Sequence, residues 1–212
     1  MESRSAWLLA IFLAAWLSSP RNCSAACTST ESCLQAVAAA QRDTRTIEAD
    51  YIQVKHLGLL AEPLVSSGRF AFKQPDLVRL DVETPDAATI LINGRNIRIP
   101  GLTEQQQTAV GTAPIGAMFS QLAKIFRGDI EDLRKDFEVT AEADGVAVRV
   151  RLVPRRDDWK KAFRSIELRF SAGLAHLETL RLDDDLGDSL EVTLRNVRRN
   201  GDLSDALFRP TD

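Results

Sequence analysis

The side chains that could hold a metal or act as catalysts are few and scattered in this chain. His56 and His176 fall in different expected strands, without the short spacing that a zinc site needs. Asp183–Asp185 could offer oxygen ligands to a cation, but a run of acids between two strands is more typical of a solvated turn. The sequence also contains no G-x-S-x-G element, phosphate-binding loop or dinucleotide fingerprint. We therefore predict that the protein is not an enzyme and has neither a metal nor a cofactor.

A second group of chemically active side chains is the basic segment 154–164, PRRDDWKKAFR. Its positive charges surround one tryptophan, and the candidate docking residues are Arg155, Arg156, Trp159, Lys160 and Lys161. Such a segment can bind an acidic partner or lipid headgroups, with the indole as an anchor. The alternative is a solvated loop with local ion pairs. We expect no nucleic-acid partner, because the chain has 27 basic against 30 acidic residues and so no basic excess.

The first residues of the chain have the pattern of a targeting segment. Arg4 precedes an apolar run at residues 6–17, whose twelve residues are too few to span a bilayer but match the core of a signal peptide. Small residues in CSAAC follow, which places cleavage after Ala25 or Ala26. We predict a cleaved signal peptide at 1–26, a mature domain at 27–212 and export from the cytoplasm. An uncleaved anchor is the alternative.

Export determines what the cysteines can do. Cleavage removes Cys23 and leaves Cys27 and Cys33, an even pair in an oxidising compartment. A disulfide between Cys27 and Cys33 is therefore a candidate, with two free thiols as the alternative. Lipid attachment to Cys27 is a weaker alternative, because Ser24 stands where a lipidation motif has leucine.

Most of the remaining chain alternates apolar and polar residues with a period of two, which is typical of antiparallel strands with one buried face. The clearest stretch is 66–99, where turns at 74–76, 85–86 and 93–94 separate four strands. The dipeptide Asn93-Gly94 predicts a tight hairpin with positive φ at both residues. Further strands are expected at 46–54, 103–111, 137–142, 146–152, 163–171, 174–183 and 189–197, which gives ten or eleven strands in all.

Helical spacing replaces this alternation in three places. Residues 32–42 are alanine-rich and predict a first helix, and residues 129–135 predict a short one. The central helix, 115–126, begins after Pro114 and ends before Gly128. Its apolar stripe consists of Ile115, Met118, Phe119, Leu122, Ile125 and Phe126.

The numbers of strands and helices together predict the fold class. Two or three helices cannot cover the apolar face of a ten-stranded sheet, and a sheet of that size tends to curl or close. We therefore expect an α+β fold in which a single strongly curved antiparallel sheet forms an unclosed β-barrel, with an α-helical lid over an apolar cavity. The candidate ligand-binding residues are Phe70, Phe72, Val78, Leu80, Ile90, Ile92, Ile115, Met118, Phe119, Leu122 and Phe126. A solid core built from the same residues is the alternative.

The order of strands and turns from Gly68 to Gly94 also resembles a known family. The matching features are the strand Gly68 to Phe72, the turn Pro75-Asp76-Leu77, the strand Val78 to Val82, the turn Pro85-Asp86 and the hairpin Ile90 to Gly94. Together with the signal peptide, the central amphipathic helix and the final LSDALFRP, they resemble the periplasmic outer-membrane lipoprotein carrier proteins of the LolA type.

This resemblance implies a function. Members of that family hold the acyl chains of lipoproteins in the cavity, receive them from an inner-membrane ATP-driven releasing complex and pass them to an outer-membrane receptor. It therefore implies a monomeric periplasmic carrier whose cargo is an acylated lipoprotein or another lipid. One departure is Gln74, which stands where the family often has an arginine that holds the lid shut. A lipid-sensing regulatory module on the same fold is the alternative.

Overall fold

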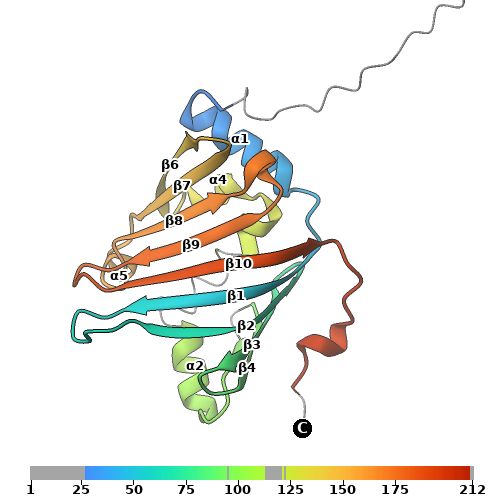
Figure 1. Cartoon of the computed structure of the whole chain (residues 1–212), viewed down its shortest axis with the longest axis vertical. Helices are drawn as coiled ribbons and strands as arrows, with labels where there is room; N and C mark the ends of the chain where they lie inside the picture. The colour runs from blue at the N-terminus through green and yellow to red at the C-terminus, as the bar shows by residue number, and fades with distance from the viewer. Residues whose placement is uncertain (1–26, 95, 113–120, 122, 211–212) are drawn as a thin grey trace, which may run out of the picture.

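The computed structural model describes residues 27–94, 96–112, 121 and 123–210. Within them, ten strands form one antiparallel sheet with the order β5-β4-β3-β2-β1-β10-β9-β8-β7-β6. The strands are β1 (Thr46–His56), β2 (Leu64–Lys73), β3 (Leu77–Thr84), β4 (Ala88–Asn93), β5 (Asn96–Arg98), β6 (Phe137–Asp144), β7 (Ala147–Pro154), β8 (Ser165–Phe170), β9 (Leu177–Asp183) and β10 (Ser189–Arg199). The two outermost strands, β5 and β6, do not pair with each other, so the curved sheet stays open (Figure 1). This confirms the predicted unclosed antiparallel sheet.

The period-two pattern fixes which side chains enter the concave face. In an antiparallel pair, directly opposed residues point to the same face. One such row joins Phe72, Val78 and Ile92, which lie opposite one another on β2, β3 and β4. The next row, two residues away, joins Phe70, Leu80 and Ile90. The apolar residues that alternate in the sequence therefore meet on one inner surface.

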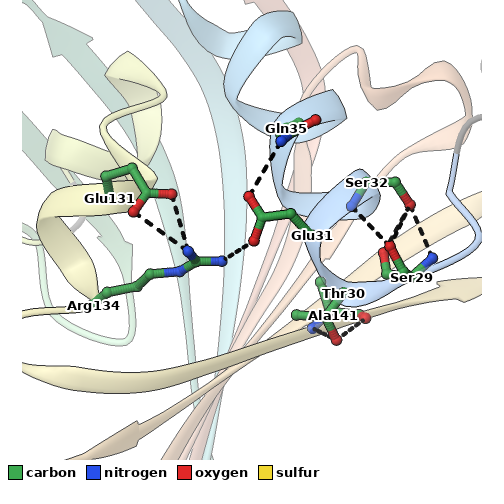
Figure 2. Close-up of polar contacts among 8 residues, drawn as sticks. All are labelled: Ser29, Thr30, Glu31, Ser32, Gln35, Glu131, Arg134 and Ala141. Atoms are coloured by element: carbon green, nitrogen blue, oxygen red, sulfur yellow. Dashed lines mark hydrogen bonds and ion pairs between the residues drawn. The ribbon is translucent and has the colours of Figure 1, made fainter.

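Helix α1 (Thr30–Gln41) lies against β6 and β7 at one edge of the sheet (Figure 1). A capping box between Ser29 and Ser32 begins the helix. The hydroxyl of Thr30 donates to the backbone oxygen of Ala141 on β6 at 3.0 Å (Figure 2). This bond satisfies one backbone group of an edge strand that has no further strand beside it.

The short helix α4 (Ile130–Leu133) is joined to α1 by an arginine. Figure 2 shows the Arg134 guanidinium between two carboxylates, at 2.5 Å from Glu31 and 3.2 Å from Glu131. The hydrogen bond from Arg134 lowers the pKa of Glu31, and this effect exceeds the opposite effect of desolvation. Both helices bury apolar side chains in the same core, Leu34 and Val37 from α1 and Ile130 and Leu133 from α4.

The segment 103–111, predicted as a strand, is instead helical, as α2 (Glu104–Thr112). Thr103 and Gln106 form the helix start: the Thr103 amide donates to Gln106 Oε1 at 2.9 Å, and the Gln106 amide donates to Thr103 Oγ1 at 3.4 Å. Such a Thr-x-x-Gln box, followed by Gln and Ala, favours a helix. The strand prediction failed because residues that are polar throughout carry no clear period.

The described end of the central helix lies inside the concavity. Residues 123–127 are helical, and Ala123, Ile125 and Phe126 are buried. The helix ends as predicted at Gly128, which has φ +76. The predicted residues Ile115, Met118, Phe119 and Leu122 lie outside the described residues, as does the predicted signal peptide at 1–26.

The hairpin after β4 turns one residue later than predicted. Gly94 has φ +58, but Asn93 is the last residue of β4 and lies opposite Asn96. The expectation of positive φ at Asn93 is therefore wrong. The remaining elements are α5 (Asp157–Lys160), η2 (Ala172–Leu174) and η3 (Asp205–Phe208).

Candidate functional site

A cavity of about 350 Å³ lies in the concave face of the sheet, lined from β1–β4, β9, β10 and the central helix. Most of its lining is apolar: Phe70, Val78, Leu80, Val82, Ile90, Phe126, Leu177, Leu180, Leu190, Val192 and Leu194. Four polar residues complete it, Tyr51, Gln53, Lys55 and Ser66. An apolar cavity with a few polar groups is the usual composition of a site for an apolar ligand.

The pairing of β1 with β10 sets the arrangement of polar and apolar lining residues. Tyr51, Gln53 and Lys55 of β1 lie opposite Leu194, Val192 and Leu190 of β10, respectively. Ser66 of β2 lies opposite Gln53 on the other side. The polar groups are thus concentrated on β1 and β2, while β9 and β10 contribute only aliphatic side chains to the lining.

Five predicted ligand-binding residues line the cavity: Phe70, Val78, Leu80, Ile90 and Phe126. Phe72 and Ile92 do not appear in the lining and are 0% and 2% exposed. They occupy the row on the side away from Lys55, where Phe72 lies opposite Val78 and its ring centroid is 5.1 Å from that of Phe126. These two residues close the inner end of the cavity instead of lining it.

Phe126 and Arg127 hold the end of the central helix against the sheet. The ring of Phe126 also packs on Phe70, with 5.7 Å between the centroids. The guanidinium of Arg127 donates to the backbone oxygen of Pro75 at 2.5 Å, in the turn between β2 and β3. Gln74, where the family often has arginine, instead donates to the backbone oxygen of Thr44 at 2.7 Å. The hydrogen bond between the central helix and this turn is therefore donated by a residue of the helix itself, Arg127.

The sequence analysis missed the lining residues of β9 and β10, and also Tyr51, Gln53, Lys55, Ser66 and Val82. Alternation identified the strands at 174–183 and 189–197, but it does not say which face points inward. The inward face is set by the pairing of β1 with β10, whose sequences lie far apart. Lys55 lies two and four residues after Gln53 and Tyr51, so the sequence places the three on one face of a strand, but only the pairing shows that this face lines the cavity.

The basic segment 154–164 differs from the prediction at its centre. Trp159 is only 3% exposed, and its ring packs edge-on against Phe137 at 4.9 Å and Phe163 at 5.7 Å between centroids. It is a core residue and cannot anchor a partner from the surface, which corrects the prediction. An indole beside charged residues can face either way, and here the two phenylalanines provide an apolar site for it.

The charged residues of that segment are exposed: Arg155, Arg156, Lys160 and Lys161. Arg156 bonds to Asp158 at 2.7 Å and lies 5.8 Å from the centroid of the Trp159 ring. Lys160 bonds to Asp157 at 3.2 Å. The segment thus has the local ion pairs that were the alternative to a docking role.

Cys27 and Cys33 are joined by a disulfide, with 4.4 Å between their Cα atoms. A groove of about 630 Å³ lies beside it and is larger than the concave cavity. Its lining includes Arg149, Arg151, Glu142 and Glu167, which form ion pairs with one another. Because these charges satisfy each other on the outside of the sheet, we take the apolar cavity as the candidate site despite its smaller volume.

The described lining residues of the cavity include no histidine, cysteine, aspartate or glutamate. Burial raises the pKa of Tyr51, and the nearby Asp81 and Glu83 act in the same direction, so its phenol remains a neutral hydrogen-bonding group. Across the described ranges, no cluster of histidine, cysteine or acidic side chains could hold a metal ion. Nor does any helix in that part of the chain combine the length and apolar character needed to cross a membrane.

A single curved, unclosed antiparallel sheet around an apolar cavity defines the structural class of this protein. Within that class, the chain belongs to the family described as outer membrane lipoprotein carrier protein LolA, whose model matches residues 42–211. This confirms the family resemblance seen in the sequence. The family is named for carriage and not for catalysis.

Two relatives found by sequence agree with this assignment. The outer-membrane lipoprotein carrier protein of Halorhodospira halophila is 31% identical over 184 residues, covering 83% of this chain and 80% of that protein. The protein of the same name from Dechloromonas aromatica is 28% identical over 178 residues, with coverages of 80% and 79%. Among solved structures, a LolA-superfamily protein from Nitrosomonas europaea has a TM-score of 0.45 at 10% identity and covers 86% of this chain and 98% of that one.

Proposed function

We propose that this protein is a periplasmic carrier that encloses acyl chains of lipoproteins, or of a related lipid, and moves them from the inner to the outer membrane. The observation that carries the proposal is a cavity of about 350 Å³ with a mainly aliphatic lining in the concave face of the sheet. The names of the relatives support lipoproteins as the cargo. In this proposal residues 1–26 are a signal peptide that is cleaved on export.

The size of the cavity suits one acyl chain. A water molecule takes about 30 Å³ in the liquid, and a methylene group is of similar size, so the cavity accommodates about twelve methylenes. Each methylene removed from water contributes about 0.8 kcal/mol, which gives roughly 10 kcal/mol for such a chain. An enclosed chain is thereby stabilised during passage through an aqueous compartment. A cargo with several chains requires the cavity to widen.

Loading and release require partners that favour different states of the cavity. We infer an inner-membrane ATP-driven releasing complex and an outer-membrane receptor, as in the family that the sequence resembles. A receptor can drive release only if it binds the open state more tightly than the closed state. The contact between Arg127 and Pro75 is one that opening at this end of the helix has to break.

Filling the cavity tests the proposal. Binding of dodecyl-chain ligands to the purified protein is measured by calorimetry for the wild type and for Leu180→Trp, which places a large ring among the lining residues. We expect the variant to lose at least tenfold in affinity. The matched control is Val153→Trp at a site 37% exposed on β7, which leaves affinity unchanged. A wild-type protein that binds no acyl ligand contradicts the proposal.

The lipid-sensing regulatory module is not favoured by a comparable observation. Its expected interaction surface was the basic segment 154–164, in which Trp159 is buried and Arg156 and Lys160 have local acidic partners.

A further inference from the structure

Among the described lining residues of the cavity, Lys55 is the only one with a charged side chain. The concave face of β1 presents Ala49, Tyr51, Gln53 and Lys55 in turn, since these residues alternate along the strand. Ala49 and Tyr51 are 7% and 5% exposed, Gln53 is half-buried and Lys55 is exposed. Polarity and exposure therefore rise together toward Lys55, which marks the open end of the cavity.

The immediate neighbours of Lys55 are apolar. It lies opposite Leu64 on β2 and Leu190 on β10, so its two cross-strand neighbours are leucines. In the part of the chain that the structure describes, no ion pair includes Lys55. On the convex face, Arg69 is paired with Glu83 and Arg79 with Asp81.

A lysine at this position has a specific chemical consequence. An ester- or amide-linked acyl chain presents neutral carbonyl oxygens, for which Tyr51, Gln53 and Ser66 are sufficient donors. The ammonium of Lys55 adds a positive charge that only an anionic group can match.

The length of the inner face is consistent with a chain ending at Lys55. The lining residues of β1 run from Tyr51 to Lys55, over which the strand rises about 13 Å at about 3.3 Å per residue, comparable to an extended chain of about ten carbons. The aliphatic side chains of Leu190, Val192 and Leu194 line that path on β10. A single chain can therefore lie along β1 and β10 with its polar end at Lys55 and Gln53.

We propose that the cavity prefers amphiphiles with one enclosed chain and an anionic headgroup, a carboxylate or a phosphate, bound by Lys55 at the open end. Gln53 and Ser66 donate hydrogen bonds to the same headgroup. This inference rests on the proposed function, because it assumes that the cavity holds acyl chains. It adds anionic single-chain amphiphiles to the neutral acyl groups of lipoproteins as a class of ligand.

Three probes with the same chain separate headgroup charge from chain burial. Dodecanoate, dodecyl phosphate and dodecanol are titrated into the purified protein at pH 8 and low salt, below the concentrations at which each probe aggregates. We expect both anions to bind at least tenfold more tightly than the alcohol. If only one anion shows the preference, the headgroup is assigned to that source, free carboxylate or phosphate.

Two variants with the same change in net charge complete the test. Lys55→Met keeps an unbranched side chain at the site without the charge, and it should bind all three probes with the affinity of dodecanol. Lys135→Met removes an exposed lysine that bonds to Asp132, outside the cavity lining, and should keep the anion preference. Melting temperatures verify that both variants are folded.

The outcomes distinguish this inference from the proposed function. Equal affinity of the wild type for anions and alcohol, or a preference that survives in Lys55→Met, overturns the role of Lys55 while leaving a carrier of neutral chains intact. A wild type that binds none of the three probes overturns both proposals.

Discussion

The two halves of the sheet bury similar side chains but pack them differently. In the packed half, β6–β8, six inward residues are at most 1% exposed: Phe137, Val150, Leu152, Ile166, Leu168 and Phe170. In the hollow half, β1–β4 with β9 and β10, inward aliphatic residues such as Leu80, Ile90 and Val192 remain half-buried around the cavity. Residue type alone therefore does not decide where the core is solid.

The difference comes from what covers each half. Trp159 and Phe163 fill the packed half with large rings, and α1 and α4 add Leu34 and Leu133 to the same core. The aromatic side chains in the hollow half, apart from Tyr51 in the lining, gather at its inner end, where Phe70 and Phe72 meet Phe126. One sheet with similar inward side chains throughout can thus form a solid core in one half and leave a cavity in the other.

The largest expected effect is in the packed half. Leu168→Ala removes a side chain with no exposure, and we expect it to lower the free energy of unfolding by about 2–5 kcal/mol. Its matched partner is Leu180, which lies directly opposite on β9 and lines the cavity. Leu180→Ala should cost less than half as much, because that side chain already lacks neighbours on one side. Urea unfolding of both variants gives the comparison, and equal losses would show that the hollow half is packed as well.

The second-largest loss of stability is expected from a substitution of Gly68, in the hollow half. A Cβ on Gly68 would stand 1.9 Å from the backbone oxygen of Asp81, so Gly68→Ala forces β2 and β3 apart. We expect a loss of about 1–3 kcal/mol, typical of overpacking. Gly58→Ala is the control, since its Cβ would meet Asp188 at an ordinary 3.6 Å. Gly68→Ala also tests the shape of the cavity, because Gly68 lies opposite the lining residue Tyr51. If Gly68→Ala unfolds in urea at the same concentration as the wild type, the close approach of β2 and β3 is contradicted.

Reduction of the disulfide should have a smaller effect, although Cys33 is buried in the packed core. The two cysteines are only six positions apart, and a loop of that size restricts the unfolded chain by roughly 2 kcal/mol. We expect the melting temperature to fall by less than about 8 °C on reduction, with the domain still folded. Cys27→Ser should reproduce the shift without reductant. Complete unfolding of the reduced protein would mean that the packed half depends on this bond.

The smallest expected effect concerns the ion pair between α1 and α4. Arg134→Gln removes the partners of Glu31 and Glu131, which are both exposed, so we expect the melting temperature to fall by no more than about 3 °C. Because the pKa of Glu31 is lowered in the folded state, its contribution is present above pH 4.5 and is lost as pH falls through the folded pKa. The difference between variant and wild type should therefore disappear in acid. A difference that persists there would assign another role to Arg134.

Local pattern in the sequence predicted most strands, the end of the central helix at Gly128 and the open sheet. It failed in the segment that forms α2, where the residues are polar throughout and show no clear period of either a strand or a helix. It also placed Trp159 on the surface, because the orientation of an indole depends on Phe137 and Phe163. Phe70, Leu80 and Ile90 were found from their alternation, whereas Lys55 and Leu190 required knowledge that β1 pairs with β10. The pairing of strands that lie far apart in the sequence is the information about the site that the local pattern does not contain.

The strand order also has a consequence for the time at which the cavity forms. The first strand, β1, lies between β2 and the last strand, β10, and the hydrogen bond between Thr30 and Ala141 joins residues 111 positions apart. Contacts of such separation form late and slow the folding of a domain. Because the hollow half combines the first four strands with the last two, a chain that emerges from its N-terminus has no complete cavity until its final residues arrive. Until then β1 exposes an unpaired edge, and the nascent protein cannot enclose a lipid.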